Sequence, residues 1–226
     1  MKAMILAAGL GKRMRPLTDT LPKPLIPVRG KPLIEWHLER LADARISEVL
    51  INISYLGDKI RQALGDGSRW GLQITYSEES EPLETGGAIR YAAHWLGDEP
   101  FLLVNADVFT QFDFATLTRR GLPASELGHL VLVPNPEFKP RGDFDLIDGK
   151  LAIMTGGSPG YTFAGISVLR PALITDYPQA RSVFGLAEVF RSALTDRQLG
   201  AELYTGHWSD VGTPSRLEEI ENHREL

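Results

Sequence analysis

Residues 3–25 read AMILAAGLGKRMRPLTDTLPKPL and place a buried strand directly before a glycine-rich, basic loop. The apolar run at residues 3–7 has the length of a strand that is buried on both faces. Gly9 and Gly11 follow it, and because they lack Cβ atoms, nearby backbone N–H groups can approach an anion closely. Fixed positive charge then comes from four side chains, those of Lys12, Arg13, Arg15 and Lys23. The segment therefore predicts a polyphosphate site at the end of the first strand.

Short apolar runs alternate with amphipathic stretches through the rest of the first half of the chain. Further strands are expected at residues 48–53, 72–76 and 101–105. Helices are expected between them, at residues 32–45, 58–64 and 86–96. Because parallel strands are joined by right-handed crossovers through helices, this order predicts an α/β fold, a Rossmann-like and mostly parallel sheet flanked by helices.

The pattern becomes richer in strands after the apolar run at residues 130–133. Residues 144–154 are typical of a hairpin that turns at Asp148-Gly149, and residues 161–169 of a further strand. The remaining expected elements are a strand at residues 201–204 and helices at residues 183–194 and 214–223. We therefore expect one domain over residues 1–226, with a small β-rich region in its second half.

The net charge of −5 is distributed unevenly along the chain. Residues 1–31 hold seven basic residues and one acidic residue, so this segment carries +6 and the other 195 residues carry −11. A concentrated positive segment on an acidic chain indicates a local site for an anionic small molecule rather than a nucleic-acid surface. We therefore expect no nucleic-acid partner.

The composition excludes several other classes of protein. The chain has no Cys, which excludes disulfides, thiolate metal sites and a cysteine nucleophile. No apolar run approaches the ~18 residues that span a bilayer. The apolar stretch at residues 3–7 is too short for a secretory signal. We therefore expect a cytoplasmic protein with no membrane partner.

Three familiar motifs are either matched only in part or lack the structural context that they need. A Walker A loop needs Ser or Thr after its lysine, and here Arg13 follows Lys12. A dinucleotide fingerprint needs a third small residue where Met14 stands, so a nicotinamide enzyme is not favoured. GGSPG at residues 156–160 has the spacing of a nucleophile elbow. A strand is expected after it instead of a helix, which argues against a hydrolase.

Two acidic residues are candidates for metal binding. Asp107 follows the strand FLLVN, at the sheet edge that also carries the glycine-rich loop. A carboxylate beside nucleotide phosphates is a natural ligand of Mg²⁺. Asp210, in HWSDVGT at residues 207–213, is the candidate partner. Position alone leaves a second interpretation open, in which Asp107 caps a turn or helix and Asp210 ends a strand.

Taken together, the motifs along the whole chain resemble those of the nucleotidyltransferases that activate sugar 1-phosphates. Residues 3–35 resemble the nucleotide-binding signature of that family. EPLETGGAI at residues 81–89 resembles its base-binding segment. LVNADV at residues 103–108 and WSDVGT at residues 208–213 resemble the segments that carry its two metal-binding aspartates.

The resemblance implies roles for individual residues. Nucleotide contacts are implied at Leu6, Ala7, Gly9, Gly11, Lys12, Arg13, Lys23, Glu79, Gly86 and Gly87. Sugar contacts are implied at Asn105, Gly142, Asp143, Thr162 and Gly165. Mg²⁺ is expected on Asp107 and Asp210, and catalytic roles are implied for Arg13, Lys23 and Asp107. Residues 1–110 would then mainly bind the nucleotide, and residues 111–226 the sugar and the second metal ligand.

The chain departs from many relatives at two points. They carry Glu-Lys-Pro on the hairpin strand, with a lysine that meets the sugar phosphate, and residues 151–157 (LAIMTGG) have no such triplet. Arg141 or Lys139 is the candidate replacement for this lysine. Phe163 stands where many relatives have Asn.

The expected reaction is transfer of a uridylyl group from UTP to N-acetylmuramic acid 1-phosphate, in cell-wall recycling. The compact length, GDF at residues 142–144 and YTFAGISVL at residues 161–169 carry this part of the resemblance. The alternatives are GTP with mannose 1-phosphate, dTTP or UTP with glucose 1-phosphate, and a catalytically silent nucleotide-sugar-binding subunit. The chain ends about 13 residues after Thr213, so no long dimerisation tail follows, and a monomer or weak homodimer is expected.

Overall fold

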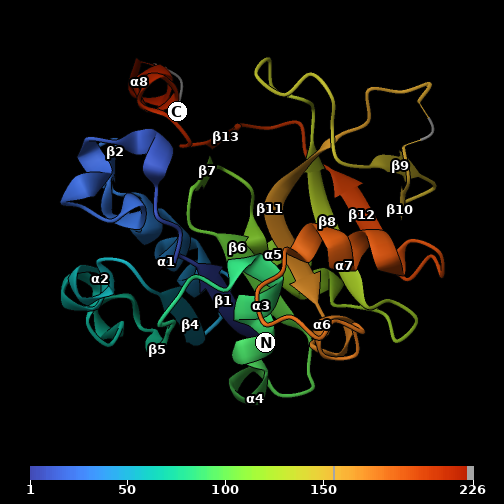
Figure 1. The fold of residues 1–226 in the computed structure, drawn as a ribbon, viewed down its shortest axis with the longest axis horizontal. Helices are drawn as coiled ribbons and strands as arrows, with labels where there is room; N and C mark the ends of the chain where they lie inside the picture. The colour runs from blue at the N-terminus through green and yellow to red at the C-terminus, as the bar shows by residue number, and fades with distance from the viewer. Residues whose placement is uncertain (155, 223–226) are drawn as a thin grey trace.

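Within residues 1–154 and 156–222, which the computed structural model describes, nine strands form one mixed sheet (Figure 1). Its strand order is β5-β4-β1-β6-β11-β8-β12-β10-β9. The strands are β1 (Lys2–Leu6), β4 (Glu48–Ile53), β5 (Gln73–Glu78), β6 (Phe101–Asn105), β8 (Gly128–Val133), β9 (Asp145–Ile147), β10 (Lys150–Ala152), β11 (Thr162–Leu169) and β12 (Leu199–Leu203). The first four strands of the order pair in parallel, as the alternation of strands and helices predicted.

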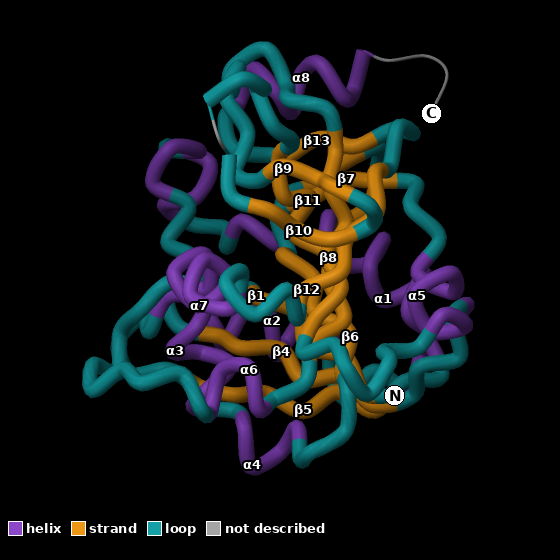
Figure 2. Tube along the Cα trace, turned by 90° about the vertical axis from the view of Figure 1, so that its right-hand side faces the viewer, coloured by secondary structure: helices purple, strands orange, loops and turns teal. Residues whose placement is uncertain are grey.

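Helices cover both faces of the sheet, which Figure 2 shows from the side. One face is covered by α1 (Leu33–Asp43), α2 (Gly57–Leu64) and α5 (Phe114–Arg120). The other face is covered by α3 (Glu84–Tyr91), α4 (Ala93–Leu96), α6 (Ala172–Thr175) and α7 (Leu186–Ala193). In the described part of the chain, no helix has the length and apolar character that crossing a bilayer requires.

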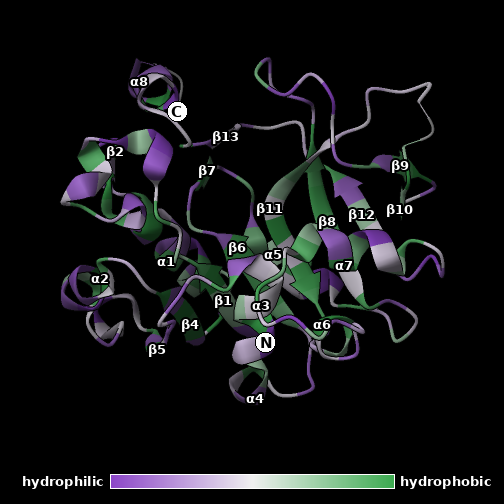
Figure 3. Ribbon diagram, in the orientation of Figure 1, coloured by the Kyte–Doolittle hydropathy of each residue, from purple (hydrophilic) through white to green (hydrophobic). Residues whose placement is uncertain are grey.

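This two-sided burial explains the uninterrupted apolar run of the first strand. Ala3 and Ile5 of β1 enter the core on one face, and Met4 enters the core on the other. All three residues are fully buried. Strands of a parallel sheet that helices cover on both sides have no polar face, and Figure 3 accordingly shows hydrophobic residues along the central strands.

The second half of the sheet is mixed in direction. β11 runs antiparallel to both β6 and β8, and its register shifts between Phe163 and Ser167. β9 and β10 form the predicted hairpin, with Asp148 and Gly149 in the left-handed region at φ 51° and 72°. Two consecutive positive φ values are typical of the tight turn that matches the twist of a hairpin.

Small elements above the carboxyl edge of β1 complete the fold. They are β2 (Pro27–Val28), β3 (Lys31–Pro32), β7 (Val108–Thr110), β13 (Trp208–Asp210), α8 (Pro214–Asn222) and the 3-10 turns Lys12–Met14, Leu17–Asp19 and Lys23–Leu25. A further 3-10 turn, Ser68–Trp70, precedes β5 at the opposite edge. Met14, Phe109, Val211 and Ile220 share one buried cluster. This cluster joins the basic loop, the segment after β6 and the C-terminal helix into one unit.

The structure confirms the α/β class and the expected bounds of β4 and β6. The single helix expected at residues 86–96 is wrong, because it is interrupted at Ala92. The Ala92 N–H still donates to the Ala88 carbonyl at 3.1 Å, but Ala92 itself is a turn residue between α3 and α4. The sequence patterns also missed α5, α6 and the short pair β7–β13. The last helix is described to Asn222, and its expected end at His223 lies outside the described residues.

Candidate active site

A pocket of about 460 Å³ opens at the carboxyl ends of β1, β4 and β6. Its lining includes most of the predicted nucleotide-binding residues, namely Leu6, Ala7, Gly9, Gly11, Lys12, Arg13, Lys23 and Glu79. Asn105 and Asp107 lie at its other wall. The ends of parallel strands meet at this edge, so residues that are far apart in the sequence surround one space.

A chain of buried polar groups fixes the floor of the pocket. The Ala7 N–H donates to Asn52 Oδ1 at 2.7 Å, and Asn52 Nδ2 donates to Glu79 Oε1 at 2.7 Å. Glu79 Oε2 accepts from the Leu83 N–H at 3.0 Å. Asn52 and Glu79 are both buried. Because both oxygens of Glu79 hold protein groups, this carboxylate fixes the segments that line the pocket.

The turn at Gly11 needs glycine. Its φ of 59° lies in the left-handed region, and a Cβ there would lie 2.8 Å from Thr18 Cγ2. Thr18 is buried, and its hydroxyl donates to the Gly11 carbonyl at 2.9 Å. The tight turn presents Lys12 and Arg13, both exposed, to the pocket.

Asp107 is paired with the lysine that the sequence singled out. Lys23 Nζ lies 2.6 Å from Asp107 Oδ2, and the two side chains are 11% and 35% exposed. Lys23 begins a 3-10 turn after Pro22, so its backbone is fixed before the side chain reaches across to the end of β6. The pair places one cation and one acid at the mouth of the pocket.

Asp210 lies beside Asp107, because β13 pairs antiparallel with β7. Asp210 is opposite Val108 in this ladder, and the Val211 N–H donates to the Asp107 carbonyl at 2.7 Å. Figure 1 shows the green β7 next to the red β13. The two aspartates predicted as metal ligands are therefore brought together by a short sheet that periodicity did not reveal.

Arg216, in the first turn of α8, forms an ion pair with Asp210. Burial and, secondly, the positive charge of Arg13 lower the pKa of Arg216 below its ordinary value. A Cβ on Gly212 would lie 2.6 Å from Arg216 Nη1 and 3.2 Å from Arg13 Nη2. The two guanidinium groups therefore converge on Gly212, which lines the pocket. Sequence reasoning missed Arg216; its signal was a cation six residues after a candidate metal ligand.

Two predicted contact residues lie behind the pocket lining. A Cβ on Gly86 would lie 2.5 Å from the Phe184 ring, and one on Gly87 would lie 2.2 Å from the Ser182 carbonyl oxygen. Both backbone N–H groups donate to the Phe184 carbonyl. These glycines let α3 approach the segment before α7, while Glu84 and Thr85 of the same helix line the pocket.

The predicted sugar-binding residues divide between the two halves of the molecule. Asn105 lines the pocket, and Gly165, at φ 74°, leaves room for its side chain, since a Cβ would lie 2.8 Å from Asn105 Nδ2. Gly142, Asp143 and Thr162 lie outside the lining of this pocket.

Those three residues belong to a separate hydrogen-bonded group of loops. Asp143 Oδ2 accepts from Lys139 Nζ at 2.5 Å and from the Phe163 N–H at 3.0 Å. The Thr162 hydroxyl donates to Asn135 Oδ1 at 2.9 Å. The structure shows these side chains as supports of the loops between β8 and β11, and their predicted contact with a sugar stays a prediction.

Asn52 is a further residue that sequence reasoning missed. The strand EVLINI ends in this buried amide, which links the loop after β1 to Glu79. A polar residue that closes an otherwise apolar buried strand was the available signal, because such a group has to find a hydrogen-bond partner.

Comparison with known proteins identifies the family. The family model described as Nucleotidyl transferase matches residues 2–142, which include the basic loop and Asp107. This chain belongs to the nucleotidyl transferase family. The chain is therefore a sugar-1-phosphate nucleotidyltransferase, an enzyme of a family whose substrates are small molecules.

Two curated relatives match the nucleotidyl transferase over nearly its whole length. N-acetylmuramate alpha-1-phosphate uridylyltransferase of Neisseria meningitidis serogroup B is 49% identical over 98% of this chain and 97% of the relative. Mannose-1-phosphate guanylyltransferase of Mycobacterium tuberculosis is 34% identical over 94% of this chain but only 61% of the relative. The second relative is thus a substantially longer protein.

Solved structures support the fold. A Bacillus anthracis structure named for glucose-1-phosphate thymidylyltransferase matches with a TM-score of 0.88 at 19% identity, over 100% of this chain and 96% of its own. HddC from Yersinia pseudotuberculosis matches with a TM-score of 0.80 at 24% identity, over 97% of both chains. At these identities the matches establish the Rossmann-like fold alone.

Proposed function

We propose that this nucleotidyl transferase transfers a uridylyl group from UTP to N-acetylmuramic acid 1-phosphate and releases pyrophosphate. The observation that carries the proposal is the 49% identity to the Neisseria uridylyltransferase, with nearly complete coverage of both chains. The relative named for mannose 1-phosphate matches 94% of this chain at 34% identity and extends well beyond the match. The pocket supports the reaction class, since its lining combines a cationic loop with Asp107, and Asp210 lies next to that residue.

The reaction joins two anions, so positioning and charge neutralisation are its main requirements. An oxygen of the sugar 1-phosphate attacks the α-phosphorus of UTP, and the bond to the pyrophosphate oxygen breaks. The attacking oxygen is already anionic, so no general base is needed. Lys23 would stabilise the charge that grows at the α-phosphate, and Arg13 would hold the leaving pyrophosphate.

A divalent metal is the usual cofactor of this family, and we propose Mg²⁺. Across residues 1–154 and 156–222, no group of three or more His, Asp or Glu side chains is placed to hold a metal ion. Mg²⁺ needs only one or two carboxylates when phosphate oxygens complete its shell. Asp107 and Asp210 fit this need, because Asp107 lines the pocket and the β7–β13 ladder places Asp210 beside it. Bound there, the metal would supply positive charge to phosphate oxygens.

The remaining parts of the proposal concern the two halves of the chain and its setting. We assign nucleotide binding mainly to residues 1–110, and sugar binding together with Asp210 to residues 111–226. A monomer or weak homodimer in the cytoplasm, where nucleoside triphosphates are available, completes the proposed enzyme.

The test is a substrate panel read by pyrophosphate release. UTP with N-acetylmuramic acid 1-phosphate is expected to give a kcat/KM at least about tenfold above GTP with mannose 1-phosphate or dTTP with glucose 1-phosphate. A higher value for either other pair would overturn the proposed substrates. No release with any pair, together with tight nucleotide binding, would instead indicate a silent binding subunit.

A further inference from the structure

Arg216 has contacts that the proposed reaction leaves unexplained. Its guanidinium pairs with Asp210, and it also lies over the Phe138 ring, 3.4 Å from the ring centroid. Phe138 belongs to the loop between β8 and β9, so this contact joins the second half of the molecule to α8. The Arg216 side chain is only 11% exposed. An arginine held by an acid and an aromatic face is fixed on both sides.

The ion pair with Arg216 occupies Asp210, a carboxylate that is expected to bind a metal ion. Asp210 Oδ1 cannot hold a guanidinium nitrogen and a divalent cation in the same place. Because the pair is partly buried, its separation costs free energy, and a cation that binds Asp210 has to offset this cost. Arg216 therefore competes with a metal for Asp210.

The surroundings of Gly212 indicate what Arg216 would bind after leaving Asp210. A Cβ on Gly212 would lie 2.6 Å from Arg216 Nη1 and 3.0 Å from Asp210 Oδ1, the anion that Arg216 already holds. A metal ion on Asp210 would leave this guanidinium without an anion beside the pocket lining. Phosphate oxygens suit such a place, because guanidinium groups bind phosphate through two parallel hydrogen bonds.

The basic residues first considered for the sugar phosphate are less well placed. Lys139 is paired with Asp143 at 2.5 Å, and Arg141 is exposed. Neither residue lines the described pocket, whereas Gly212, beside Arg216, does.

We propose that Arg216 is a phosphate-binding residue that stays paired with Asp210 until a divalent cation binds this carboxylate and releases the guanidinium. The freed guanidinium then binds the phosphate of the sugar 1-phosphate, and Phe138 keeps it beside the pocket. Arg216 thereby replaces the lysine that residues 151–157 lack. The phosphate-binding half rests on the proposed function, whereas the competition at Asp210 does not.

The competition is tested by titrating the protein with Mn²⁺ in the absence of substrates and measuring the affinity by calorimetry. Arg216→Gln is expected to bind Mn²⁺ about tenfold more tightly than the wild type, because its competitor is gone. Arg216→Lys keeps the charge and is expected to fall between the two. Arg119→Gln removes a surface ion pair with Asp113 and is the matched control, with unchanged affinity. Equal or weaker Mn²⁺ binding by Arg216→Gln would overturn the competition.

The phosphate-binding role is tested by steady-state kinetics at saturating Mg²⁺. Arg216→Gln is expected to raise the KM for the sugar 1-phosphate at least about tenfold and to change the KM for UTP less than about twofold. Arg216→Lys should restore part of the loss. If Arg141→Gln or Lys139→Gln raises the sugar-phosphate KM and Arg216→Gln does not, the assignment to Arg216 is wrong. The Mn²⁺ measurement needs no sugar. An error in the proposed substrate would therefore affect the kinetic result but not the measured competition at Asp210.

Discussion

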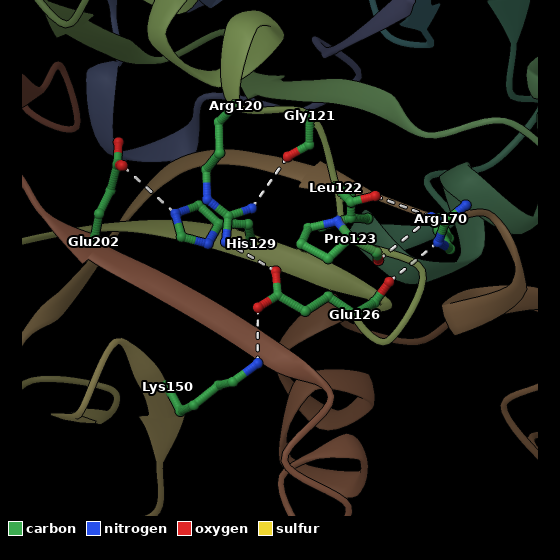
Figure 4. A network of polar contacts seen from close by, with 9 residues as sticks. All are labelled: Arg120, Gly121, Leu122, Pro123, Glu126, His129, Lys150, Arg170 and Glu202. Atoms are coloured by element: carbon green, nitrogen blue, oxygen red, sulfur yellow. Dashed lines mark hydrogen bonds and ion pairs between the residues drawn. The ribbon is translucent and has the colours of Figure 1, made fainter.

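Two groups of charged side chains, one at the pocket and one around Glu126, differ in the number of cations that pair with each carboxylate. At the pocket, Asp107 and Asp210 each pair with one cation, Lys23 or Arg216. Far from the pocket, Glu126 pairs with two cations at once, Lys150 at 2.7 Å and Arg120 at 3.0 Å (Figure 4).

The environment of Glu126 is closed. Its side chain is 7% exposed, and Arg170 donates to its backbone carbonyl at 3.1 Å. Burial alone would raise the pKa of Glu126, but hydrogen bonds from Lys150 and Arg120 outweigh it and hold the pKa below its ordinary value. Figure 4 shows this acid surrounded by its partners, with His129 and Glu202 beside it.

The difference lies in the number of partners and in access. Asp107 is 35% and Asp210 is 25% exposed, and one cation apiece leaves carboxylate oxygens that a ligand can use. Glu126 has cations on both oxygens and little exposure. We infer that the first group can exchange its partners and that the second fixes the ends of β8 and β10.

The sharpest test of this contrast is Asp107→Asn. Loss of the charge is expected to lower turnover at least about a hundredfold, since neutralisation of phosphate charge is the main catalytic requirement. The free energy of unfolding should fall by less than in Glu126→Gln, because Asp107 is 35% exposed and pairs with a single cation, Lys23. Near-wild-type turnover in Mg²⁺, for this variant and for Asp210→Asn, would contradict the assignment of metal ligands.

His37 is a buried titratable group that carries no charge in the folded protein. The pH dependence of the free energy of unfolding tests this. His37 is 1% exposed and stacked on Phe114, and burial, followed by the nearby Arg40, lowers its pKa from 6.5 to about 4. Between those values the unfolded chain binds a proton that the folded protein does not. The free energy of unfolding should therefore fall by up to about 3 kcal/mol as pH drops from 6.5 to 4.

Denaturant unfolding at several pH values measures this loss. His37→Leu should remove most of the pH dependence in that window. His94→Leu, at an exposed position, is the matched control and should retain it. An unchanged slope in His37→Leu would assign the acid sensitivity to another group.

Glu126→Gln is the counterpart of the aspartate variants. It leaves two partly buried cations without their acid, so the free energy of unfolding should fall by about 2 kcal/mol. Because Glu126 lies far from the pocket, turnover at a temperature where the variant is folded should stay within about twofold. A variant with normal stability and lost turnover would reverse the roles of the two groups.

The smallest effect is expected at the turn that carries the basic loop. Gly11→Ala forces a side chain into the left-handed region against Thr18, at a cost of about 1 kcal/mol. Gly9→Ala, where a Cβ would meet nothing within 4 Å, should leave stability unchanged. Equal destabilisation by the two variants, measured by thermal unfolding, would show that the positive φ of Gly11 and the contact with Thr18 do not decide the stability of this turn.

The parallel half of the sheet and the basic loop were predictable because local patterns specify them. The apolar run of residues 3–7 and the spacing of Gly9 and Gly11 are visible in the sequence. The adjacency of Asp107 and Asp210 depends on β7 and β13, whose short length gives no periodic signal. The resemblance to a family supplied that pairing; composition and spacing did not. Arg216 was missed because its separation of six residues from Asp210 does not show that the two side chains meet in space.

The pairing of β7 with β13 also has a consequence for the synthesis of this protein. Asp107 and Asp210 are separated by more than a hundred residues, so the β13 segment is synthesised well after the β7 segment with which it pairs. A nascent chain can build the parallel strands and the basic loop first, since their contacts lie within its earlier part. The ladder that brings Asp210 beside Asp107 can form only after residues 208–210 have been synthesised.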